Sequence, residues 1–139
     1  MTGINGRVLI ISEVELSAAT RQSLTAGGFD LSTAEHAGDG YQQLLESPFD
    51  LVIVSLDEPS TGVELIKRIR SNSALKRLLI LLVAEWGTGQ ATMALAQGAN
   101  AFEPKPLENE RLLLAVARLL QSNMVMSTKA ANADREVEA

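Results

Sequence analysis

The sequence predicts an α/β fold, in which a doubly wound, five-stranded parallel sheet is covered by helices on both faces. Apolar runs rich in β-branched residues and leucine alternate along the 139-residue chain with segments of helical periodicity. The runs are continuous and not alternating, which is typical of parallel strands buried on both sides. Five strand–helix units in succession therefore predict a three-layer (βα)5 sandwich with crossovers of one hand.

Three of the five expected strands are strong apolar runs, at residues 8–11, 51–54 and 78–83. A weaker second strand is expected at residues 29–33, after two glycines, and a short fifth strand at residues 100–103. Runs of about four to six residues are of the length usual for strands in globular proteins.

Helical segments are expected at residues 16–26, 41–46, 63–70, 90–97 and 107–121. A serine–proline pair ends the second segment, and a glycine follows the fourth. In the third segment, leucine and isoleucine fall on one face, opposite lysine and arginine. Each segment can therefore bury one side against the sheet.

The composition excludes several classes of function. The net charge of −5 lacks the basic excess of domains that bind nucleic acid through bulk charge. The chain has no cysteine, which excludes disulfides, thiolate catalysis and cysteine-based metal sites. No apolar run approaches the roughly 20 residues of a membrane span, and residues 1–6 contain no apolar signal core. We expect a cytoplasmic protein without nucleic-acid or membrane contacts.

The periodic pattern covers one domain, at residues 7–121. From about residue 122 the pattern is lost, and residues 130–139 are mostly small and charged. Residues 122–139 are therefore expected to be a C-terminal tail, either disordered or the start of a linker.

Polar residues gather where the predicted strands end. In a doubly wound sheet, ligands bind at the carboxyl ends of the strands, near the switch point in strand order. The residues expected at this edge are Ser12-Glu13, Ser55 to Glu58, Ala84-Glu85 and Pro104-Lys105. This edge is therefore the predicted functional site.

Three stretches of the sequence resemble the response-regulator receiver domain of two-component signalling. Residues 50–62 resemble that family's third strand and phosphorylation loop. Residues 94–102 resemble its fourth helix and fifth strand, and Lys105-Pro106-Leu107 resembles its lysine–proline turn. The resemblance covers about residues 7–120 and implies a CheY-like, flavodoxin-like fold with a role in phosphorelay signalling.

The chain departs from this family at the positions that carry its chemistry. The family phosphorylates an aspartate at the end of the third strand, where this sequence has Ser55. Of the two acidic residues that hold magnesium after the first strand, one is replaced by Ser12 and the other by the longer Glu13. The family's threonine or serine after the fourth strand is replaced by Val83.

Two switch-equivalent positions are kept, the aromatic Phe102 and the basic Lys105. In the family, a hydrogen bond from the threonine or serine hydroxyl to the phosphoryl oxygen draws in the loop and lets the aromatic residue turn inward. Val83 cannot form that bond, so the resemblance implies that phosphorylation would not move Phe102. Lys105 is expected to pair with Glu13 or Asp57 in place of a phosphoryl group. The sequence leaves open whether the bond between Lys105 and the following proline is cis or trans.

These departures favour a degenerate receiver, or pseudo-receiver, that acts as a phosphorylation-independent protein–protein interaction module and not as an enzyme. Its expected partners are a histidine kinase or another response regulator. Serine needs a base to act as a nucleophile, and Glu13 is the only candidate near Ser55. The alternative is an active phosphoacceptor that uses Asp57 or Glu13 with magnesium, although Ser55, and not Asp57, has the family's spacing to Pro59.

No resident cofactor is expected. Ser12, Glu13 and Asp57 form a vestigial acidic pocket, in which Glu13 and Asp57 could bind magnesium weakly. A nucleotide- or flavin-binding domain would need a glycine-rich phosphate loop after the first strand, whereas Ser-Glu-Val-Glu-Leu stands there. The sequence therefore disfavours a dinucleotide or flavin cofactor.

The fifth predicted helix carries a candidate partner surface. An apolar stripe that begins at Leu112 should face the sheet, whereas Leu114 lies between Arg111 and Arg118 on the other side. With Phe102, these three residues belong to the face of the fourth helix, fifth strand and fifth helix, which receiver domains use for dimer and output contacts. We expect a signalling partner or a second copy of the chain to bind this face.

Overall fold

The computed structural model describes residues 6–14, 17–85, 87–105 and 108–121. They form a five-stranded parallel sheet with the strand order β2-β1-β3-β4-β5. The elements in chain order are β1 (Gly6–Ser12), α1 (Ala18–Ala26), β2 (Phe29–Ala34), α2 (Ala37–Glu46), β3 (Leu51–Ser55), α3 (Pro59–Ser71), η1 (Ser73–Leu75), β4 (Leu79–Ala84), α4 (Thr88–Gln97), β5 (Ala101–Pro104) and a helix over residues 109–121, which we call the C-terminal helix. The predicted fold class is confirmed, and the expected tail at residues 122–139 lies outside the described residues.

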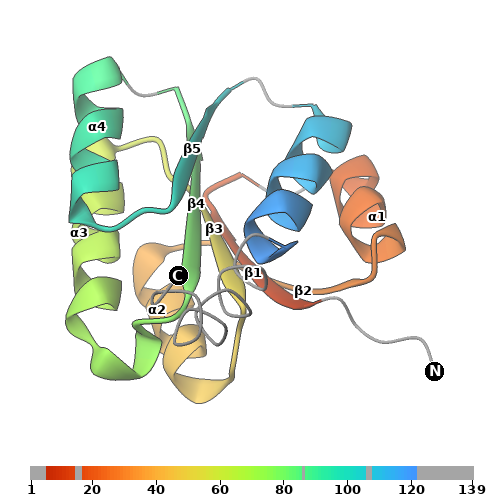
Figure 1. Ribbon diagram of the computed structural model, residues 1–139, viewed down its shortest axis with the longest axis horizontal. Coiled ribbons are helices and arrows are strands. Elements are labelled where there is room, and N and C mark those ends of the chain that lie inside the picture. Colours follow the sequence, from red (N-terminus) through yellow and green to blue (C-terminus); the bar gives the residue numbers. More distant parts are fainter. Residues whose placement is uncertain (1–5, 15–16, 86, 106–107, 122–139) are drawn as a thin grey trace, which may run out of the picture.

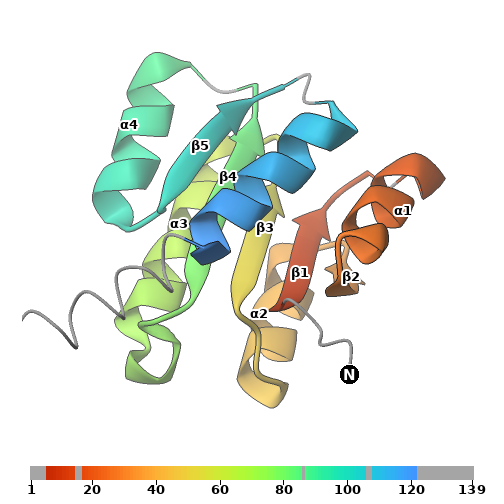
Figure 2. The ribbon, with the colours of Figure 1, turned by 45° about the vertical axis from the view of Figure 1, so that its right-hand side comes forward.

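Helices cover both faces of the sheet, which Figure 1 shows close to edge-on. α2, α3 and α4 lie on one face, and α1 and the C-terminal helix lie on the other. Figure 2 shows the strands in order, from β5 at one edge to β2 at the other. The strand order reverses between β1 and β3, and ligands of such sheets bind outside the carboxyl ends at this switch point.

Two hydrophobic clusters hold the helices to the sheet, because successive strand residues point to opposite faces. Leu9 and Ile11 of β1 belong to the cluster beneath α2, α3 and α4. Val8 and Ile10 belong to the cluster beneath α1 and the C-terminal helix. Burial of both faces explains why the strands are continuous apolar runs.

Helices α2 and α3 begin earlier than predicted. α3 begins at Pro59, about one turn before the expected start. Proline is favoured at the first helical position, because the N–H that it lacks would have no partner within the helix there. α2 begins at Ala37, four residues before the expected start at residue 41. Gly40 is buried, and a Cβ at this position would collide with Ile11 of β1. This glycine therefore permits close packing of helix on strand and does not form a turn.

The C-terminal helix confirms its predicted apolar stripe. Leu112 and Val116 are buried in the cluster beneath this helix, whereas Leu114 is 48% exposed on the other side. Thr20 Oγ1 of α1 donates a hydrogen bond of 2.6 Å to Asn109 Oδ1 of the C-terminal helix. This bond joins the two helices of one layer.

Arg70 of α3 ties that helix to the loop that precedes β5. Its Nε donates to the carbonyl of Gly98 at 2.9 Å, and its Nη2 donates to Asn100 Oδ1 at 2.8 Å. The same Asn100 oxygen accepts the Ile80 N–H at 2.8 Å. Burial lowers the pKa of the Arg70 guanidinium by desolvation. The network fixes the start of β5, the strand that leads to Lys105.

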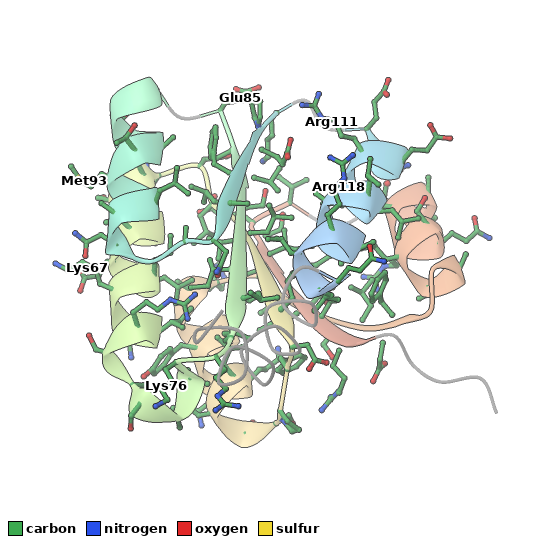
Figure 3. All side chains as sticks on the ribbon, in the orientation of Figure 1. Lys67, Lys76, Glu85, Met93, Arg111 and Arg118 are labelled. Atoms are coloured by element: carbon green, nitrogen blue, oxygen red, sulfur yellow. The ribbon has the colours of Figure 1, made fainter. Side chains whose placement is uncertain are left out.

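The variant Arg70→Met is expected to lower the free energy of unfolding by about 1–3 kcal/mol, because it leaves the carbonyl of Gly98 and the side chain of Asn100 without their charged donor. Urea unfolding followed by circular dichroism measures this change, and the slope of the transition should stay constant. Lys67→Met, on the exposed side of the same helix (Figure 3), should change stability by less than about 0.5 kcal/mol. Equal losses in both variants would contradict the structural role of Arg70.

Candidate functional site

The carboxyl ends of four strands meet at one edge of the sheet. β1 and β3 are neighbours, and their parallel register pairs Ser12 with Ser55. β4 and β5 pair Ala84 with Pro104 at the same edge. The structure thus brings together the loops in which the sequence placed the functional site. We call this edge the rim, and it consists of residues 12–14, 55–58, 84–85 and 104–105.

Two hydroxyl groups stand where β1 and β3 end. Ser12 Oγ donates to the Val14 carbonyl at 2.9 Å and accepts from the Val14 N–H at 3.3 Å, so it is engaged within its own loop. Ser55 is the last residue of β3 and is half-buried. Neither strand therefore ends in a carboxylate.

Glu13 joins two loops of the rim. Its Oε1 accepts a hydrogen bond of 3.0 Å from the backbone N–H of Asp57, which follows β3. The sequence predicted Glu13 as a rim acid but not this bond, because every residue type except proline carries the same backbone donor. One oxygen of Glu13 is thus engaged in holding the loop after β3.

Lys105 lies beside Asp57, which is one of the two partners that the sequence left open. Its Nζ is 3.8 Å from Asp57 Oδ1, and the two side chains are 29% and 80% exposed, respectively. The Lys105 N–H donates to the Ala84 carbonyl at 3.1 Å, which extends the β4–β5 pairing and places Lys105 at the rim. The bond between Lys105 and Pro106, whose isomer was left open, lies outside the described residues.

The two other switch-equivalent residues are packed into opposite clusters. Val83 of β4 is buried beneath the C-terminal helix, in the cluster that contains Leu112 and Val116. Phe102 of β5 is half-buried and packs against the cluster on the other face of the sheet. Val83 thus contributes methyl groups to the core and offers no hydroxyl to the rim.

The oxygen atoms at the rim that could ligate a metal ion do not match the preferences of magnesium, the ion that the receiver resemblance implies. Magnesium demands near-octahedral oxygen ligands and is held by carboxylates together with water. Ser12 replaces one carboxylate, one Glu13 oxygen accepts an N–H, and one Asp57 oxygen faces Lys105. Within the part of the chain that the structure describes, no group of three or more acidic, histidine or cysteine side chains is placed to hold a metal ion. Weak binding at Glu13 and Asp57 remains a prediction.

The predicted partner face is open to solvent on the C-terminal helix. Leu114, Arg111 and Arg118 are all exposed there, and Figure 3 labels both arginines. Arg111 Nε lies 3.4 Å from Glu103 Oε1 of β5, which links helix and strand across this face. Phe102 is half-buried, so it contributes more to the core than to this surface.

Helix α4 adds two exposed apolar side chains that the sequence did not single out. They are Met93 and Leu95, and Figure 3 shows Met93 pointing away from the sheet. The buried side of α4 carries the small residues Ala91 and Ala94. The buried side of α4 is no more apolar than its exposed side. The sequence alone therefore does not indicate which of its apolar residues face solvent.

A doubly wound sheet with the strand order β2-β1-β3-β4-β5 and a polar rim at its switch point is an architecture that receiver domains share with flavodoxin. A family model for the response regulator receiver domain matches residues 8–117, and the chain therefore belongs to this family. Receiver domains are signalling modules of two-component systems, generally without enzymatic activity, and they interact with histidine kinases or other response regulators.

Two curated relatives are transcriptional regulators. The transcriptional regulatory protein DltR of Streptococcus agalactiae is 28% identical over 126 residues, which is 88% of this chain and 56% of that protein. The phosphate regulon transcriptional regulatory protein PhoB of Rhizobium meliloti is 29% identical over 118 residues, which is 83% of this chain and 52% of that protein. The chain thus spans about half the length of the curated relatives that it matches.

Two solved structures share the fold. One is the CheY-like response regulator receiver domain protein from Methanospirillum hungatei, with a TM-score of 0.75, 22% identity, and coverage of 86% of this chain and 97% of that one. The other is HP1043, an orphan response regulator of H. pylori, with a TM-score of 0.76, 23% identity, and coverage of 85% and 98%. These likenesses support the receiver fold and leave the chemistry of the rim to the residues of this chain.

The variants Asp57→Asn and Lys105→Met are each expected to change the free energy of unfolding by less than about 1 kcal/mol, because their ion pair is long and partly exposed. A double-mutant cycle by urea unfolding measures the coupling between the two side chains, which should be at most about 0.5 kcal/mol. A coupling several times larger would show that the pair is a principal structural contact of the rim.

Proposed function

We propose that this receiver domain signals by protein–protein contact that does not depend on aspartyl phosphorylation. The observation that carries the proposal is Ser55, which stands at the end of β3 beside Ser12 and leaves the strand ends without a carboxylate. Phosphoryl transfer to a receiver needs a positioned anionic nucleophile, a metal ion and a cation. Of these three, the described rim offers only the cation, Lys105, in its expected place.

The chemistry of serine supports the same conclusion. A hydroxyl becomes a competent nucleophile only when a base within hydrogen-bond reach removes its proton. Glu13 is the nearby acid, and its Oε1 is engaged with the Asp57 N–H. Phosphorylated Ser55 would also be a stable ester, not the labile acyl phosphate of the family. We therefore assign the domain no enzymatic activity of its own.

One observation favours the alternative, an active receiver that is phosphorylated on Asp57. The Asp57 carboxylate lies 3.8 Å from Lys105, and a lysine beside the acceptor is what the family resemblance implies. Against it, Asp57 lies beyond the end of β3 with its side chain 80% exposed, and it lacks the spacing to Pro59. The contact between Lys105 and Asp57 therefore supports the alternative less strongly than the position of Ser55 at the end of β3 supports the proposal.

Incubation with acetyl phosphate and magnesium tests the proposal directly. Intact-mass spectrometry should show no labile gain of about 80 Da, because the end of β3 lacks a nucleophilic carboxylate. A receiver with an intact acceptor aspartate, treated in parallel, shows that the reagent is active. An adduct on this chain that disappears in Asp57→Asn would establish the alternative and end the proposal.

The binding partner that we propose is a histidine kinase, another response regulator or a second copy of this chain. The face formed by α4, β5 and the C-terminal helix supports the proposal, because Leu114 of that helix is 48% exposed to solvent. Arg111 and Arg118 flank Leu114 on the same helix, and arginine is enriched at protein interfaces. An exposed leucine between two arginines suits a contact between proteins.

We assign no nucleic-acid or membrane contact to this domain. Its net charge of −5 gives no basic excess, and no described helix is long and apolar enough to cross a bilayer. The transcriptional-regulator names of the relatives concern proteins about twice as long as the matched region. Cytoplasmic location remains a prediction from the sequence.

If the face mediates a homodimer, Leu114→Glu should weaken self-association by tenfold or more, because it places a charge at the apolar contact. Tenfold corresponds to about 1.4 kcal/mol. Sedimentation velocity over a range of protein concentrations measures the dissociation constant. Leu45→Glu is a matched control, since Leu45 of α2 is also 48% exposed but lies away from this face. A monomeric wild-type chain, or equal effects of both variants, would contradict the homodimer.

A further inference from the structure

Two of the rim acids, Glu13 and Asp57, are engaged with groups of the protein itself. Glu13 Oε1 accepts the Asp57 N–H at 3.0 Å, and Asp57 Oδ1 lies 3.8 Å from Lys105 Nζ. We infer that Glu13 is a positioning residue, whose hydrogen bond holds the loop after β3 directly and competes with a divalent cation for the same carboxylate. The inference deepens the proposed function, on which it rests, by stating how the same site is held.

The position of Glu13 allows a direct bond between the two loops. Glu13 follows β1 and Asp57 follows β3, and these strands are parallel neighbours, so the two loops leave the sheet side by side. Ser55, at the end of β3, is the register partner of Ser12. A glutamate has one methylene more than an aspartate, which extends its reach from the end of one strand into the neighbouring loop. The bond therefore needs no bridging ion.

A cation and this hydrogen bond compete for the same carboxylate. A cation bound at Oε1 would lie close to the positive end of the Asp57 N–H dipole, and the two would repel each other. The other ligands are poor substitutes, because the Ser12 hydroxyl is engaged with Val14 and the Asp57 carboxylate faces the positive Lys105. Magnesium also gives up its water reluctantly. The rim therefore favours the direct bond over the cation.

The consequence is a loop whose conformation is set without metal or phosphoryl group. The Asp57 N–H is fixed by Glu13, and the Asp57 side chain is placed beside Lys105. These contacts connect the ends of three strands, β1, β3 and β5. A partner that recognises the rim would therefore find the same surface whether or not magnesium is present.

Amide hydrogen exchange of the whole chain, followed by NMR without added metal, tests the inference. In Glu13→Ala, the Asp57 amide should exchange about five- to tenfold faster than in the wild type, because it loses its acceptor. Glu13→Gln keeps an acceptor oxygen and should give a smaller increase. Glu85→Ala removes an exposed rim carboxylate after β4 (Figure 3) and should leave Asp57 exchange unchanged.

Magnesium chloride provides the second readout. At about 10 mM magnesium, which would fill a site with a dissociation constant of about 1 mM, the wild-type Asp57 amide should keep its chemical shift and its exchange rate. Equal Asp57 exchange in Glu13→Ala and the wild type would overturn the inference, as would a saturable shift of Asp57 at about 1 mM magnesium. A labile adduct from acetyl phosphate, with Asp57 exchange still dependent on Glu13, would instead overturn only the proposed function.

Discussion

The parallel register of β1 and β3 sets Ser12 beside Ser55 at the switch point of the sheet, and the chemistry available to the rim depends on this pair. A receiver that captures phosphate needs carboxylates at these strand ends. There they hold the metal ion, and one of them attacks the phosphoryl group. A pair of hydroxyls supplies no such group. Two acids of the rim, Glu13 and Asp57, find partners within the protein, a backbone N–H and Lys105.

The residues that would relay phosphorylation are integrated into the core. Val83 packs with the C-terminal helix, and Phe102 packs against the cluster on the opposite face of the sheet. Arg70 fixes the start of β5 through Gly98 and Asn100, which stabilises the strand that carries Phe102. We therefore propose that this receiver scaffold works without a phosphoryl-driven rearrangement, with the exposed surface of the C-terminal helix available to a partner.

The sequence was sufficient to predict the sheet, because strands buried on both faces leave continuous apolar runs. It was less reliable at helix starts: α2 begins at Ala37, four residues before the predicted start, and Gly40 within it permits close contact with Ile11. At the rim, the resemblance left two alternative partners for Lys105, and the structure places Asp57 beside it. The bond between Glu13 and the Asp57 N–H could not be predicted, because its donor is a backbone group positioned only by the fold.

The most direct test of the central claim is an NMR titration with beryllofluoride and magnesium, which together mimic an aspartyl phosphate. If the rim has no acceptor, the amide resonances of Ser55, Asp57 and Phe102 should remain unchanged throughout the titration. Saturable shifts at the rim that extend to Phe102 would contradict this account, because they would demonstrate an acceptor carboxylate coupled to the aromatic switch position.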